Sequence, residues 1–229
     1  MPFQAHYQLP CLRLLALLLT AALLPACSSL GPDWRLEKQT DGINYFVRQS
    51  HHPSLPEFKA SIRIDASIPE VMQVVTDFSH FPDWVYRCEE TKVIALVGYT
   101  DAYVYQVNSL PIITDRDIIL HGQTQRSEDG KQMQIQLIAE PDYCINNDDE
   151  DCASIIKSPY VRVRSASGLF TLIAVSSDTT EVTWQQFLDP GGAIPHWLFR
   201  LMLSQVPVQS LKNLKALVEK NGAKNNVSG

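Results

Sequence analysis

The sequence lacks the short motifs by which the commonest enzyme classes are recognised. It contains no Gly-x-Ser-x-Gly nucleophile turn, no His-Glu-x-x-His zinc motif, no phosphate-binding loop and no dinucleotide-binding glycine pattern. His80, His121 and His196 are scattered along the chain, and each is expected to be structural. The sequence therefore predicts no catalytic residue, no metal site and no cofactor.

Excess positive charge is also missing. Lysine and arginine number 19 against 25 aspartates and glutamates, which gives a net charge of -6 at pH 7, and no basic patch is present. A nucleic acid is therefore not an expected partner.

Internal repeats and interdomain linkers are absent as well. A chain of 229 residues allows one large domain or two small ones, and the lack of a linker favours one.

A long apolar run occurs at the N-terminus. Residues 14–24 are apolar except for Thr20, which is too short a stretch to span a bilayer comfortably and fits the core of a signal peptide. The following Leu24-Pro25-Ala26-Cys27 resembles a bacterial lipoprotein signal, in which the cysteine is acylated and becomes the first mature residue. A plain secretory signal or an uncleaved anchor is the alternative.

The expected boundaries are a signal peptide over residues 1–26 and a short tether over residues 27–32. Ser28 follows Cys27, and the absence of aspartate there resembles the pattern of lipoproteins sent to the outer membrane. We therefore expect a periplasmic protein that an acylated Cys27 anchors to the outer membrane. Several fatty chains are sufficient for stable anchoring.

Export implies an oxidising compartment, which bears on the cysteines. Cys144 and Cys152 flank a strongly polar segment between two expected strands, so we expect a hairpin loop closed by a disulfide. Such a short loop gains about 2–3 kcal/mol from the crosslink. The oxygen-rich residues 146–151 suggest calcium as an alternative, but the EF-hand spacing is missing. Cys88 has no partner and is expected to be a buried apolar residue.

The middle of the chain predicts strands joined by short turns. Residues 58–64 alternate apolar and polar side chains, as a half-buried strand does. Ser67, Pro69 and Glu70 have the spacing of a helix start and predict a helix that ends near Ser79. Successive hairpins imply a curved antiparallel sheet. The expected strands span residues 34–38, 43–47, 58–64, 91–97, 102–108, 112–122, 131–140, 160–175 and 180–188.

The last segment predicts one long amphipathic helix. A cluster of proline and glycine at residues 189–195 ends the preceding strand, and an apolar stripe then continues to about residue 220. A helix of about 25 residues would be roughly 37 Å long and would lie across the sheet. Pro207 should kink it. A kinked helix on a curved sheet can leave a hollow, although a solid core is the simpler alternative.

Four features in this order resemble a START domain, the lipid-transfer domain related to the steroidogenic acute regulatory protein. They are Asp41-Gly42-Ile43 before a strand, the pair Arg116-Asp117, Gly168 with Thr183-Trp184, and the run 189–195. The resemblance covers residues 33–220 and leaves 221–229 as an expected disordered tail. It implies an α+β helix-grip fold, in which a curved antiparallel β-sheet wraps around a long C-terminal α-helix and encloses an apolar cavity.

The same resemblance implies that the cavity binds a lipid or another hydrophobic small molecule, for transport or sensing at the cell envelope. For Tyr103, Tyr105 and Trp184, core packing is the alternative role. Arg116 and Asp117 cannot both face the cavity because neighbouring strand residues point to opposite sides, and a structural ion pair or strand-end hydrogen bonds are the alternative for them. The candidate ligand-binding residues are Tyr103, Tyr105, Val107, Arg116, Ile118, Leu120, Trp184, Leu201 and Val208.

Two other functions are open at this point. Polyketide cyclases and aromatases share the helix-grip fold, so a cavity with tyrosine, histidine and arginine could support acid-base chemistry, although the family is usually not catalytic. An envelope adaptor that binds another protein in the same groove is the second. The sequence leaves the ligand and the oligomeric state undetermined.

Overall fold

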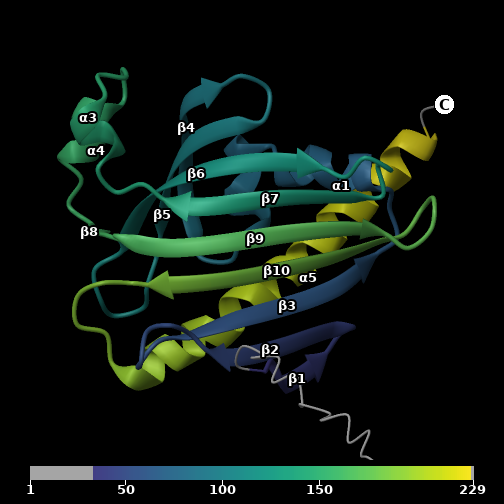
Figure 1. The fold of residues 1–229 in the computed structure, drawn as a ribbon, viewed down its shortest axis with the longest axis horizontal. Helices are drawn as coiled ribbons and strands as arrows, with labels where there is room; N and C mark the ends of the chain where they lie inside the picture. The colour runs from purple at the N-terminus through teal and green to yellow at the C-terminus, as the bar shows by residue number, and fades with distance from the viewer. Residues whose placement is uncertain (1–32, 228–229) are drawn as a thin grey trace, which may run out of the picture. The chain divides into compact units, whose positions relative to one another are not determined.

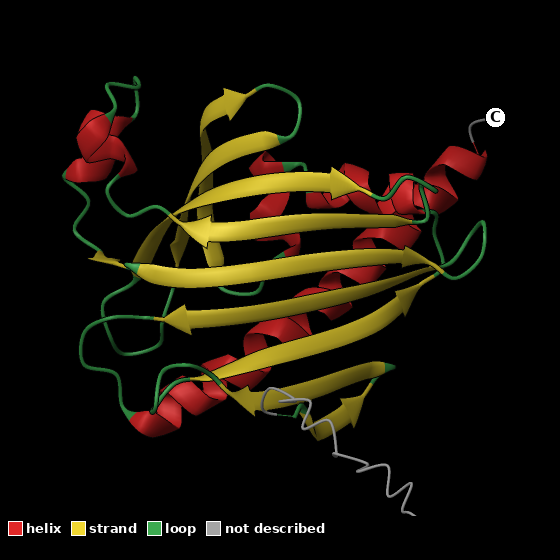
Figure 2. Ribbon diagram, viewed as in Figure 1, coloured by secondary structure: helices red, strands yellow, loops and turns green. Residues whose placement is uncertain are grey.

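The protein is described here by a computed structural model, which covers residues 33–227. The signal peptide, the tether and Cys27 lie outside these residues. These residues form one compact unit. A single sheet of ten strands curves around helix α5, which lies across one of its faces (Figures 1 and 2). The predicted α+β helix-grip fold is therefore confirmed.

The sheet follows the strand order β1-β2-β3-β10-β9-β7-β6-β5-β4, and β8 pairs with β6. All neighbours on the main path are antiparallel, whereas the short β8 runs parallel to β6. The strands are β1 (Arg35–Thr40), β2 (Ile43–Gln49), β3 (Pro56–Ile64), β4 (Cys88–Val97), β5 (Asp101–Asn108), β6 (Arg116–Arg126), β7 (Gln132–Ala139), β8 (Val161–Arg162), β9 (Ser165–Ala174) and β10 (Thr180–Asp189).

The helix predicted up to Ser79 is shorter than expected. Helix α1 covers Ile68–Val75, and its N-cap is Ser67, whose backbone N–H donates to the Glu70 carboxylate at 2.7 Å. The side chains of Ser79 and His80 then bond to the Asp77 carboxylate, and such local contacts compete with helix continuation. The chain passes through the 3₁₀ turn η1 (Phe78–His80) into the short helix α2 (Phe81–Trp84), a segment in which no element was expected.

Helix α5 spans His196–Val227, so it continues past residue 220, where the sequence placed the end of the domain. The expected disordered tail over 221–229 is thus helical as far as Val227. No proline follows Pro207 to stop the helix. Leu211 and Leu214 on α5 are fully buried in the main core, which also contains residues of the sheet and of helix α1. No helix within residues 33–227 is long and apolar enough to cross a membrane.

The opposite face of the sheet carries a small insertion after β7. Cys144 and Cys152 form the expected disulfide, but it joins two short helices, α3 (Tyr143–Asn146) and α4 (Cys152–Ile156), where a hairpin loop was predicted. Both cysteines pack with Tyr105, Val107 and Ile119 in a separate apolar cluster. The insertion therefore buries the outer face of β5 and β6. Cys88 is free and buried, as expected.

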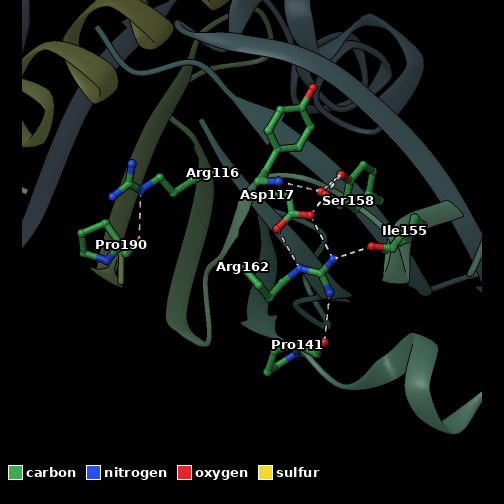
Figure 3. A network of polar contacts seen from close by, with 9 residues as sticks. Arg116, Asp117, Pro141, Ile155, Ser158, Arg162 and Pro190 are labelled. Atoms are coloured by element: carbon green, nitrogen blue, oxygen red, sulfur yellow. Dashed lines mark hydrogen bonds and ion pairs between the residues drawn. The ribbon is translucent and has the colours of Figure 1, made fainter. Parts of the chain in front are cut away.

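A buried ion pair connects this insertion to the sheet. The side chains of Arg116 and Asp117 leave β6 on opposite sides and do not pair with each other (Figure 3). The Asp117 carboxylate instead accepts two hydrogen bonds from the Arg162 guanidinium, at 2.8 and 2.9 Å, and one from the Tyr105 hydroxyl at 3.1 Å. Arg162 also donates to the carbonyls of Pro141 and Ile155. Residues 163–164 separate β8 from β9, so the predicted strand 160–175 forms two strands.

Candidate functional site

A cavity of about 430 Å³ lies between the concave face of the sheet, helix α2 and the first half of α5. Four aromatic side chains form much of its wall. Trp184 on β10 stacks on Phe170 of β9 with ring centroids 5.0 Å apart, and Phe58 of β3 meets Trp184 edge-on at 5.3 Å. Trp84, which α2 contributes, faces Phe170 edge-on at 6.1 Å. Such geometries are favourable for aromatic pairs, so the wall is well ordered.

Strand β6 contributes to the cavity as the sequence predicts. Arg116, Ile118 and Leu120 line it, and Trp184 does so from β10. These alternate positions share one face of their strand, which points at α5. Four of the nine candidate residues are therefore brought together around one space. Gly122 continues the same face, and a Cβ atom there would come within 3.4 Å of the Leu137 side chain.

The three candidates on β5 were assigned to the wrong face. The cavity is lined by Ala102, Val104 and Gln106, whereas Tyr103, Tyr105 and Val107 point to the outer face. The insertion after β7 covers that face, so both sides of β5 are largely buried and the large side chains do not mark the inner one. Tyr103 stacks there on His121 and Tyr143, with ring centroids 4.4 and 4.1 Å apart.

The two candidates on α5 also lie outside the cavity. Leu201 is 38% exposed, and Val208 packs against the main core. The cavity is lined instead by Leu198, Met202 and Val206, which follow each other at four-residue intervals. The apolar stripe of α5 contains more residues than those that line the cavity, because the other residues of the stripe pack on β3 or α1 or face solvent. Its periodicity alone therefore does not identify the lining residues.

Polar groups occur at both ends of β5. Asp101 lines the cavity at the β4–β5 turn, where Leu96 and Tyr99 are also in the lining and are exposed, so the cavity reaches the surface there. Arg87 and Arg116 line the opposite end. Burial lowers the pKa of Arg116, although the nearby Asp115 charge opposes this effect, and the side chain is only 5% exposed.

Arg116 also fixes the loop that leads into α5. Its guanidinium donates to the carbonyl oxygens of Pro190 at 3.4 Å and Gly191 at 3.2 Å, and to that of Thr114 before β6 (Figure 3 shows the Pro190 contact). Gly191 and Gly192 both have φ of 63°, a conformation that strongly favours glycine. The proline and glycine run therefore makes a tight turn whose carbonyls meet a buried arginine.

Several lining residues were not among the sequence candidates. Phe58 belongs to the apolar face of the strand with the clearest alternation. Trp84 and Arg87 fall between the predicted helix and the strand expected from residue 91, where no element was expected, and Phe170 lies in the over-long predicted strand. No periodic signal marks Arg87, because it stands between α2 and β4.

Comparison with known protein families matches residues 19–224 to the START domain. An uncharacterized protein of Pseudomonas aeruginosa is 27% identical over 196 residues, which cover 85% of this chain and 91% of that protein. A STAR-related lipid transfer protein from Xanthomonas axonopodis is 28% identical with a TM-score of 0.69, over 81% of this chain and 98% of that one.

Human STARD10 has the same fold at 17% identity. Its TM-score is 0.67, and the similarity covers 84% of this chain and 76% of STARD10. The family match extends over most of the sequence, and it agrees with the sheet, the long C-terminal helix and the cavity between them. The chain belongs to the START domain family.

Proposed function

We propose that the protein binds a lipid or another hydrophobic small molecule in the cavity between the sheet and α5. The observation that carries this proposal is the cavity itself, about 430 Å³ in volume and walled mainly by aromatic and aliphatic side chains. Cavities of this size and composition are typical of small-molecule sites. The similarity to a STAR-related lipid transfer protein supports the same conclusion.

The energetics of such binding are favourable. A ligand that buries about 400 Å² of apolar surface gains roughly 10 kcal/mol at about 25 cal/mol per Å². The loss of translational and conformational freedom offsets part of this gain and leaves an affinity in the micromolar to nanomolar range. Binding of this kind involves no chemical reaction of the ligand, so the role that we propose is binding for transport or sensing.

The test is to purify the protein from cells under non-denaturing conditions, extract it with organic solvent and analyse the extract by mass spectrometry. We expect one hydrophobic or amphiphilic species at close to one molecule per chain. An unrelated exported protein purified in the same way gives the background. An extract at that background, together with no binding of the neutral dye Nile red, would contradict the proposal.

We also propose that the protein acts at the cell envelope, attached through an acylated Cys27. Replacing Cys27 by serine removes the thiol that would carry the acyl chains, each of which contributes about 0.8 kcal/mol per buried CH₂. We expect the Cys27→Ser protein to move from the membrane fraction to the soluble fraction, as measured by immunoblotting after fractionation. Ser28→Ala is the matched control and should stay in the membrane. Retention of Cys27→Ser in the membrane would rule out this anchor.

A further inference from the structure

One end of the cavity carries two arginines and no acid. Arg87 immediately precedes β4, and its carbonyl accepts a hydrogen bond from the Ser109 N–H at 2.8 Å. Next along β5, Asn108 is the register partner of Arg116 on β6. Arg87 and Arg116 thus lie two strands apart, about 10 Å between backbones at the usual strand spacing. Both line the cavity, so their long side chains can reach one small group between them.

Neither arginine is neutralised by a carboxylate. Among residues 33–227, the ion pairs include no partner for Arg87 or for Arg116. The nearby Asp115 carboxylate accepts a hydrogen bond from the Leu110 N–H at 3.1 Å. Asp101 lines the cavity from the far end of β5. The partners of Arg116 are three backbone carbonyls, which leave part of its five-donor fork free.

Arg87 is held in an unusual conformation with an unused donor. Its backbone φ is 70°, a left-handed value that is strained for a residue other than glycine. Its guanidinium lies 5.2 Å from the centre of the Tyr86 ring, and its Nε–H is buried with no hydrogen-bond partner. A buried donor on a charged group without a partner is costly, so the arrangement indicates a missing acceptor.

We propose that the ligand is an anionic amphiphile whose carboxylate or phosphate oxygens bind Arg87 and Arg116, while its apolar body lies along Trp84, Phe170 and Trp184. This inference rests on the proposed binding of a hydrophobic ligand. The planar guanidinium fork matches carboxylate and phosphate geometry, and such charge-assisted hydrogen bonds are about twice as strong as neutral ones. The head group also removes the cost of two cations at an apolar cavity.

Three probes with one 18-carbon chain test the inference: oleate, oleyl phosphate and the neutral oleyl alcohol. Each displaces Nile red from the purified protein below its own aggregation concentration. At least one of the two anions is expected to bind about tenfold or more tightly than the alcohol. The stronger of the two identifies whether the head group is a carboxylate or a phosphate.

Variants of Arg87 test whether this arginine causes the preference for anions over the alcohol. Arg87→Met keeps an unbranched apolar side chain but removes the charge and the donors, so the anion preference should fall at least about fivefold while the affinity for the alcohol is unchanged. Arg87→Lys retains the charge and should keep most of the preference. Arg164→Met is the control, because Arg164 is exposed on the outer surface and pairs with Asp142.

The outcomes separate this inference from the proposed function. If wild-type protein binds the alcohol as tightly as both anions, the anionic head group is wrong and hydrophobic binding stands. The inference also fails if Arg87→Met weakens all three probes equally in a protein with an unchanged circular dichroism spectrum. If neither Nile red nor any probe binds, the proposed function itself fails.

Discussion

Replacing Ala102 by tryptophan is expected to reduce the affinity for a hydrophobic ligand at least about 100-fold, which corresponds to about 2.7 kcal/mol. Ala102 is buried on β5, and its small side chain forms part of the cavity wall. An indole at this position would occupy the space that the ligand needs. The fold should be retained, because the added ring enters an existing void and displaces no packed side chain. Nile red titration measures the affinity, and circular dichroism with thermal melting checks the fold.

The matched control is Tyr103→Trp, on the same strand one residue later. Tyr103 lies on the outer face, stacked on His121 and Tyr143, so an indole there leaves the cavity untouched. We expect an affinity within about twofold of wild type. The pair therefore tests which face of β5 points at the ligand. Loss of binding in Tyr103→Trp with normal binding in Ala102→Trp would reverse the assignment of this strand.

The succession of strands along the chain and the long last helix could be predicted because local signals are strong there. Apolar and polar residues alternate along residues 58–64, and the glycine and proline run at 189–195 is followed by an apolar stripe at helical spacing. Both signals come from elements with one buried face and one solvent-exposed face. Where that asymmetry holds, the sequence predicts the type of element and its buried face, but on α5 it does not identify the residues that line the cavity.

The inward face of β5 could not be predicted, since both of its faces are buried. The insertion with α3 and α4 covers Tyr105 and Val107 from outside, and the apolar residues of the strand then carry no information about direction. The end of the cavity with Arg87 was also missed. Arg87 has a left-handed backbone and lies in the connection between α2 and β4, which has no periodic pattern. Only the tertiary structure therefore shows where its side chain lies.

Replacing Asp117 by alanine is expected to destabilise the domain by about 3–5 kcal/mol. The Asp117 side chain is fully buried, and its carboxylate is the partner of Arg162, whose side chain is only 20% exposed. Removing it leaves a largely buried guanidinium and the Tyr105 hydroxyl without their acceptor. For a domain of this size the melting temperature should fall by roughly 6–20 °C, which calorimetry measures.

An exposed ion pair on the same insertion provides the control. Asp142 pairs with Arg164, and their side chains are 48% and 65% exposed. Asp142→Ala should therefore cost at most about 1 kcal/mol. If Asp142→Ala and Asp117→Ala lowered the melting temperature equally, burial would not be the source of the effect, and the Asp117 network would not be what holds the insertion to the sheet.

The charge of Asp117 makes this contribution depend on pH. Burial raises the pKa of Asp117, but the hydrogen bonds from Arg162 and Ser158, the Arg162 charge and the Tyr105 hydroxyl together hold it below its usual value. The stabilisation is therefore complete above the unfolded pKa of about 3.9 and is lost as the pH falls through the lower folded value. The difference in unfolding free energy between wild type and the isosteric Asp117→Asn should accordingly be largest at neutral pH and shrink in acid. A difference that stays constant from pH 7 to pH 3 would mean that Asp117 acts through its shape and not through its charge.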